Sequence, residues 1–208
     1  MASPFDQSRY QVRFEWGTEG LARLAPADVV VVVDVLRFSS TVVGRVAAGE
    51  SVALDEAAHA VSVNGAVVAA HAADALILLG CVRNAGAVAR AVLAHQHDRG
   101  ARTSIAVIAA GEREGRDGPV RFAVEDQLGA GAIVDALGVL GIDHTSPEAA
   151  ATGEAFRGLR PALRHLLTAS GSGQELIDLD RRDEVLAASV LDDLDAVPVL
   201  RDGVFVAY

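Results

Sequence analysis

Five consecutive valines, Val29–Val33, stand between two aspartates, Asp28 and Asp34. Branching at Cβ favours an extended backbone, and an apolar run without polar alternation is typical of a strand that is buried on both faces. Both faces of a strand are buried in this way when helices pack on each side of a parallel sheet. The valine run therefore constrains the chain to an α/β fold more tightly than any other feature of the sequence.

Further apolar segments repeat this pattern along the chain. Residues 75–80 and 103–109 predict two more buried strands. Residues 38–48, 84–97 and 125–140 predict the helices that follow the three strands. Because strands and helices alternate, we expect a three-layer α/β/α arrangement around a mixed, largely parallel sheet.

Shorter segments border this pattern. Residues 10–16 alternate apolar and polar side chains and predict a half-exposed strand, and residues 185–188 predict another. Residues 196–206 predict a hairpin. The sequence contains no repeat of fixed period and no linker, so we expect one domain over residues 1–208.

Composition excludes several classes of function. The formal net charge is −10 and no stripe of basic residues is present, so nucleic acid is not an expected partner, because phosphate backbones need clustered cations. All 18 basic residues are arginines, which excludes a lysine-dependent mechanism. The single cysteine, Cys81, cannot form a disulfide within the chain, and its apolar surroundings predict a buried hydrophobic residue.

The sequence also lacks the signals of a membrane or exported protein. No apolar stretch reaches the ~18 residues that a membrane span requires, and residues 1–10 lack the apolar region of a signal peptide. We therefore expect a cytoplasmic protein that does not bind a membrane. The hydrophobic fraction of 51% suggests a homodimer.

The turn after the valine run is the first candidate site. In open α/β sheets, ligands bind beyond the carboxyl ends of the strands. Asp34 ends the buried strand, and Arg37 offers a bidentate guanidinium group to an oxyanion. We interpret Ser39, Ser40 and Thr41 as capping residues and as anion contacts at a helix N-terminus. An ordinary helix cap beside a surface arginine is the simpler alternative, but two charges in one turn exceed what a cap needs.

Two other strand ends deliver polar residues. Asn84 follows the second buried strand, where helix capping explains it as well as ligand binding does. Glu112 follows the third strand, and Glu125 and Asp126 open the next helix, where acids also interact favourably with the helix dipole. Asp34, Glu125 and Asp126 would together form an all-oxygen cluster of the kind that Mg²⁺ prefers. These three residues are therefore the predicted metal ligands.

The same segments resemble the 2-phosphosulfolactate phosphatase (ComB-like) family, in an order and spacing that run nearly end to end. The element Asp34-Val-Leu-Arg37 and the element Glu125-Asp126-x-x-x-Ala-Gly131 are fairly specific when they occur together. The other matching positions are Trp16, residues 30–41, the turn Asn64-Gly65, residues 79–85, 109–112 and 122–131, and Val197-Pro198-Val199.

This resemblance implies a Mg²⁺-dependent phosphatase with a three-layer α/β/α fold, which hydrolyses phosphosulfolactate to sulfolactate and phosphate in coenzyme M biosynthesis. The leading hypothesis is hydrolysis of such a small anionic phosphomonoester. A carboxylate would either orient a water molecule or itself attack phosphorus, and the sequence leaves both routes open. The catalytic residues would be Asp34, Arg37, Glu125 and Asp126, and the substrate contacts would be Ser39, Ser40, Thr41, Asn64, Asn84 and Glu112.

The chain departs from the family pattern between Glu56 and Asn64. Family members have a longer stretch here that contains a Gly-Asn-Ser-Pro segment, and this chain has only a few residues in its place. The alternative hypothesis is therefore a non-catalytic member that binds a small anionic metabolite after losing part of the site. A nucleotide-binding Rossmann-like domain is disfavoured, because no G-x-G-x-x-G motif follows a strand and no P-loop lysine is present.

Overall fold

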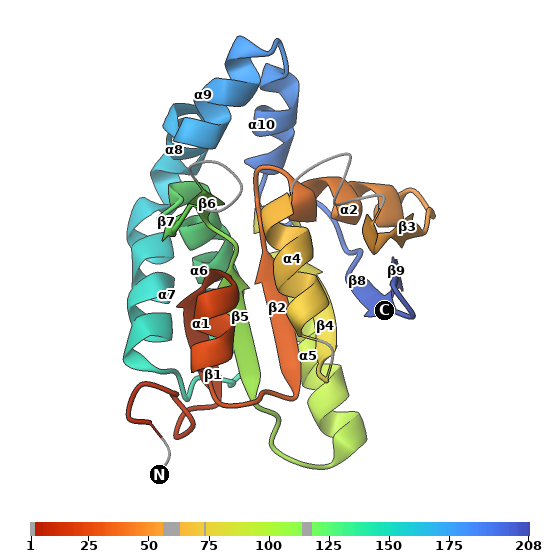
Figure 1. Cartoon of the computed structure of the whole chain (residues 1–208), viewed down its shortest axis with the longest axis vertical. Helices are drawn as coiled ribbons and strands as arrows, with labels where there is room; N and C mark the ends of the chain where they lie inside the picture. The colour runs from red at the N-terminus through yellow and green to blue at the C-terminus, as the bar shows by residue number, and fades with distance from the viewer. Residues whose placement is uncertain (1–2, 56–62, 73, 114–117) are drawn as a thin grey trace.

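The valine run forms an interior strand of a seven-stranded sheet in the computed structural model, which describes residues 3–55, 63–72, 74–113 and 118–208. This strand is β2 (Val29–Val33). The other strands of the sheet are β1 (Val12–Trp16), β3 (Val52–Ala53), β4 (Leu76–Gly80), β5 (Ile105–Ala109), β8 (Pro198–Arg201) and β9 (Val204–Ala207). Their order is β1-β5-β2-β4-β8-β9-β3 (Figure 1). This sheet confirms the predicted α/β class.

The register of the sheet decides where the polar residues gather. Strands β1, β5, β2 and β4 run parallel, and β8, β9 and β3 extend the sheet in antiparallel pairs. Val33, the last residue of β2, pairs with Gly80 on one side and with Ala109 on the other. The segments that follow β2, β4 and β5 therefore leave the sheet at one edge, which we call the carboxyl edge.

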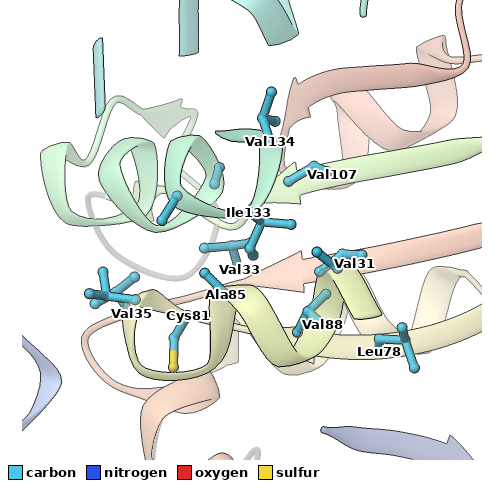
Figure 2. Close-up of a cluster of buried hydrophobic side chains, with 14 of the residues drawn as sticks. Val31, Val33, Val35, Leu78, Cys81, Ala85, Val88, Val107, Ile133 and Val134 are labelled. Atoms are coloured by element: carbon cyan, nitrogen blue, oxygen red, sulfur yellow. The ribbon is translucent and has the colours of Figure 1, made fainter. Parts of the chain in front are cut away.

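Alternate valines of β2 supply two separate cores. Val31 and Val33 pack with Ile133 and other apolar side chains on one face, as Figure 2 shows. Val30 and Val32 pack on the opposite face. The first face is covered by α5 (Ala85–Arg99) and α6 (Val124–Val139), and the second by α1 (Gly17–Arg23), α2 (Phe38–Ala47) and α4 (Val63–His71). These two helical layers confirm the three-layer arrangement.

The remaining elements extend the molecule beyond the carboxyl edge. These elements are β6 (Glu112–Arg113), β7 (Val120–Arg121), η1 (Val82–Asn84), α7 (Pro147–Leu159), η2 (Arg160–Ala162), α8 (Leu163–Ala169), α9 (Gly171–Asp178) and α10 (Arg182–Ala188). Helix α7 packs along α6, and α8, α9 and α10 form an arm above the strands (Figure 1). A two-stranded sheet of β6 and β7 and the 3₁₀ turn η1 lie beside the carboxyl edge.

Two local predictions are wrong. Asn64-Gly65 does not form a turn between elements, because both residues lie in the first turn of α4. Residues 185–188 form part of a helix rather than a strand, and their buried side chains, Val185 and Ala188, have the three-residue spacing of a helix face. The predicted hairpin at residues 196–206 is confirmed by the antiparallel pair of β8 and β9.

Other predictions have mixed outcomes. Cys81 is fully buried, as expected from its apolar surroundings. Residues 56–62, which include most of the shortened Glu56–Asn64 region, lie outside the described residues. Within the described ranges, every helix is too short or too polar to cross a membrane. The expected cytoplasmic location and homodimer stay predictions.

Two glycines of α6 test how this helix packs. A Cβ atom on Gly131 would lie against the carbonyl oxygen of Thr152 in α7 and 2.6 Å from Cβ of Phe156, whereas nothing lies within 4 Å of a Cβ on Gly138. We expect Gly131→Ala to lower the free energy of unfolding by about 1–3 kcal/mol, because backbone atoms of α7 would have to move. Gly138→Ala should raise it by about 0.5–1 kcal/mol, since alanine favours the helix. Urea denaturation measures both, and equal effects would contradict the close approach.

Candidate active site at the carboxyl edge

The turn between β2 and α2 holds Asp34 in a fixed orientation. Its side chain is 4% exposed, and its two carboxylate oxygens accept hydrogen bonds from the backbone N–H groups of Phe38 and Gly65, each at 3.1 Å. Gly65 is required at this contact, because a Cβ atom there would lie 2.9 Å from Asp34 and 2.7 Å from Phe38. Asp34 therefore caps the start of α2, a role that we had predicted for Ser39, Ser40 and Thr41. The N-cap position itself is occupied by Arg37, which makes no side-chain cap.

Asp126 joins two loops of the carboxyl edge. It lies in the first turn of α6 and is 3% exposed. One carboxylate oxygen accepts the N–H of Val35 at 2.7 Å, and the other accepts the N–H of Gly111 at 2.9 Å. Val35 follows β2 and Gly111 follows β5, so a single side chain fixes the ends of two neighbouring strands.

Glu125 is linked to a helix that is distant in the sequence. Its carboxylate is 3% exposed and accepts a hydrogen bond of 2.5 Å from the hydroxyl of Ser172 in α9. The same hydroxyl lies 3.3 Å from Glu112. The amide of Asn64 in turn donates to Glu112 at 3.3 Å and to the carbonyl of Gly111 at 3.2 Å. The network brings together Asn64, Glu112 and Glu125 from three separate elements.

The carboxylates Asp34, Glu125 and Asp126 form a group that we call the acidic cluster. Burial raises the pKa of Asp126 well above its ordinary value, and the charges of Asp34 and Glu125 raise it further. The two N–H bonds from Val35 and Gly111 act in the opposite direction. The cluster therefore concentrates negative charge in a buried place, where the charges of Asp34 and Glu125 disfavour the charged form of Asp126.

Arg37 opens onto a different space. It lines a cleft of about 440 Å³ together with Ser40 and Thr41. The hydroxyl oxygen of Ser40 is buried without a hydrogen-bond partner among the described residues, and it lies near the Cys81 thiol. Arg37 also forms no ion pair within the described part of the chain. The charged groups that act on Arg37 are Arg181, Glu184, Asp34 and Glu175.

Two residues that were predicted to contact the substrate form hydrogen bonds to other parts of the protein instead. Ser39 is fully buried, and its hydroxyl accepts the N–H of Asp34 and donates to the carbonyl of Val32. Asn84 is also fully buried, and its amide bonds the backbone groups of Cys81, Leu79 and Ala196 and the Cys81 thiol. Both side chains stabilise the loops around the site.

Two backbone donors at the start of α2 are used within the fold. The N–H of Ser39 bonds the carbonyl of Asp34, and the N–H of Thr41 bonds the carbonyl of Arg37. The side chains of Arg37 and Thr41 line the cleft beside them.

The donor set suits a hard cation. Carboxylate oxygens are the ligands that Mg²⁺ takes in proteins, usually one or two of them with water and phosphate oxygens. In the described ranges, neither Glu125 nor Asp126 forms an ion pair with an arginine. Among the same residues, no group of three or more His, Cys, Asp and Glu side chains has the geometry to hold a metal ion by itself.

Three contacts of the site were missed by sequence reasoning. They are made by the Ser172 hydroxyl and by the N–H groups of Gly65 and Gly111. A signal for Ser172 exists in the segment Ser170-Gly-Ser-Gly173, which opens α9 with Ser170 as its cap. The contact with Glu125, 47 residues earlier, has no such local signal.

The fold and this edge define an α/β protein with a carboxylate-rich site next to an arginine that can bind an oxyanion. A family model described as 2-phosphosulpholactate phosphatase matches residues 52–203, which is more than half of the chain. The chain therefore belongs to the 2-phosphosulpholactate phosphatase family, whose members are phosphoric monoester hydrolases. The matched region contains Glu112, Glu125 and Asp126, while Asp34 and Arg37 precede it. Comparison with curated proteins gives no match.

The bond between Ser172 and Glu125 can be tested by stability. Ser172→Ala removes the hydroxyl donor of a buried carboxylate, so we expect the free energy of unfolding to fall by about 1–3 kcal/mol. Ser189→Ala is the matched control, because the Ser189 hydroxyl bonds the backbone carbonyl of Leu186 at the end of α10 rather than a carboxylate. Urea denaturation of the two variants should give a clearly larger loss for Ser172→Ala, and similar losses would argue against the bond.

Proposed function

We propose that this chain is a Mg²⁺-dependent phosphomonoester hydrolase that acts on 2-phosphosulfolactate or a closely related phosphorylated hydroxy acid, with sulfolactate and phosphate as products. The observation that carries the proposal is the acidic cluster, three buried carboxylates at the carboxyl edge with Arg37 a few residues away. Membership of the 2-phosphosulpholactate phosphatase family supports the same reaction class.

Asp34 together with Glu125 or Asp126 would hold the metal. Buried charges are stable when they are paired or coordinate a metal. The pKa of Asp126 is raised first by its burial and then by the charges of Asp34 and Glu125, and a cation would offset these charges. Bound Mg²⁺ supplies positive charge that offsets the negative charge of the phosphoryl oxygens.

The protein side chains contribute position and charge. Asp34 and Asp126 are each held by two backbone N–H bonds, so their carboxylates need no reorganisation when substrate binds. The Arg37 guanidinium offers paired N–H donors to a substrate oxyanion. Asn64 and Glu112 border the acidic cluster and would orient the hydroxy-acid part of the substrate.

Charge removal in the acidic cluster tests the proposed catalytic role. Asp34→Asn should lower kcat by roughly a thousandfold or more, because a site that stabilises phosphoryl transfer loses a positioned charge. Glu125→Gln is the companion variant, since its amide oxygen can still accept the bond from Ser172. Phosphate release and far-UV circular dichroism are measured together, so that loss of activity is separated from loss of folding.

The control for these variants is Asp135→Asn. It makes the same carboxylate-to-amide change in α6, the helix that contains Glu125, but at a residue outside the acidic cluster that is paired with Arg157. We expect its activity to equal that of the parent protein. A folded Asp34→Asn variant with the same rate as Asp135→Asn would contradict the proposal.

Metal dependence is tested with racemic 2-phosphosulfolactate and a small panel of phosphorylated hydroxy acids, each with Mg²⁺ and with EDTA. Phosphate release that EDTA abolishes and Mg²⁺ restores is the expected result. Absence of release from every substrate, with the protein folded and its melting temperature still raised by these compounds, would instead support the non-catalytic anion-binding alternative.

A further inference from the structure

The cleft next to Arg37 is unusually positive for this chain. It opens between α2, η1 and α10, and Figure 1 shows the lower end of α10 near the start of α2. Four arginines and two glutamates line it, which gives the lining a formal charge of +2 in a chain of formal net charge −10. The charged residues are Arg37, Arg45, Arg83, Arg181, Glu50 and Glu184. We call this space the arginine cleft.

Two arginines of the cleft form two-pronged ion pairs that differ in their exposure to solvent. Arg83 bonds Asp193 at N–O distances of 2.5 and 2.9 Å, and these side chains are 19% and 30% exposed. Arg181 bonds Glu184, three residues further on, at 2.6 and 2.9 Å, and these side chains are 35% and 43% exposed. Because solvent screens the more exposed pair, Arg181 can exchange Glu184 for a ligand oxyanion at a lower cost than Arg83 can exchange Asp193.

We propose that the arginine cleft is a second oxyanion subsite, which binds the sulfonate or carboxylate group of the substrate while its phosphoryl group lies at the acidic cluster, and that Arg181 determines specificity there. The placement of the phosphoryl group rests on the proposed function. The trigonal carboxylate and the tetrahedral sulfonate both present a pair of negatively charged oxygens, which a guanidinium recognises through two N–H donors.

The geometry of the turn allows one small molecule to reach both places. Asp34 and Arg37 are three residues apart, so their Cα atoms lie at most about 11 Å from each other. Arg37 faces the cleft and is influenced by Asp34 and by Arg181. Burial lowers the pKa of Arg37, and the positive charge of Arg181 lowers it further. An anion between the two guanidinium groups would relieve that repulsion.

The size and lining of the cleft also suit such a ligand. Its volume of about 440 Å³ falls in the range of small-molecule sites. Ser40 and Thr41 lie on its wall and place small polar residues beside Arg37.

Direct binding tests the subsite without any catalysis. Sulfolactate carries a sulfonate and a carboxylate but no phosphoryl group, and calorimetric titration gives its dissociation constant. Arg181→Leu should weaken binding about tenfold or more, the cost of a lost charge-assisted contact. Glu184→Gln should strengthen it several-fold, because it removes a negative charge and frees Arg181. Isethionate, which has only the sulfonate, and lactate, which has only the carboxylate, identify the group that is bound.

The matched control is Arg90→Leu, which removes an ion-paired surface arginine of α5 that does not line the cleft. Its dissociation constant should stay within twofold of the parent value. Equal effects of Arg181→Leu and Arg90→Leu, or no binding of the three probes by the parent protein at millimolar concentration, would overturn the proposal. Opposite effects of Arg181→Leu and Glu184→Gln would support it.

Kinetics separate this subsite from the proposed function. With 2-phosphosulfolactate, Arg181→Leu should raise KM at least tenfold with little change in kcat, while p-nitrophenyl phosphate, which has no second anion, should be hydrolysed as by the parent protein. Equal losses with both substrates would contradict a specificity role. Absence of phosphatase activity in the parent protein would refute the proposed function, and sulfolactate binding would still decide the subsite.

Discussion

The arrangement of the site depends on one buried carboxylate, that of Asp126. It accepts one N–H from the loop after β2 and one from the loop after β5, and thereby holds together two segments that the sheet alone would leave independent beyond its edge. The cost is a concentration of negative charge, because Asp34 and Glu125 are buried in the same place. The interaction that orders the loops therefore also gathers three carboxylates in one buried place.

The parts of the structure that the sequence predicted are those set by local pattern. The side chains of Val29–Val33 are buried only when apolar neighbours cover both faces of the strand. The buried strand and its two helical layers therefore follow from the run itself. The grouping of Asp34, Glu125 and Asp126 was predicted for a related reason. Each residue stands directly beside an apolar segment whose direction the strand pattern determines. Parallel strands then bring these residues to one edge.

The parts that escaped prediction depend on contacts between distant segments. Asn64-Gly65 has the local signature of a turn, yet Gly65 lies against Asp34 inside the first turn of a helix. Asn84 resembles a ligand contact in sequence, but its amide is consumed by the backbone groups of Leu79 and Ala196. The second of these is 112 residues away, and no local pattern indicates such a partner.

The strand order of the sheet has a consequence for the synthesis of the chain. Strand β3 pairs with β9, and the β8–β9 hairpin lies between β3 and β4. Val52 therefore leaves the ribosome about 150 residues before its partner, Phe205. The parallel half of the sheet can assemble while translation continues, but one flank of β4 stays open until the hairpin arrives. An exposed strand edge of this kind is a template for unwanted pairing, so the nascent chain is most vulnerable to aggregation just before its last strands are made.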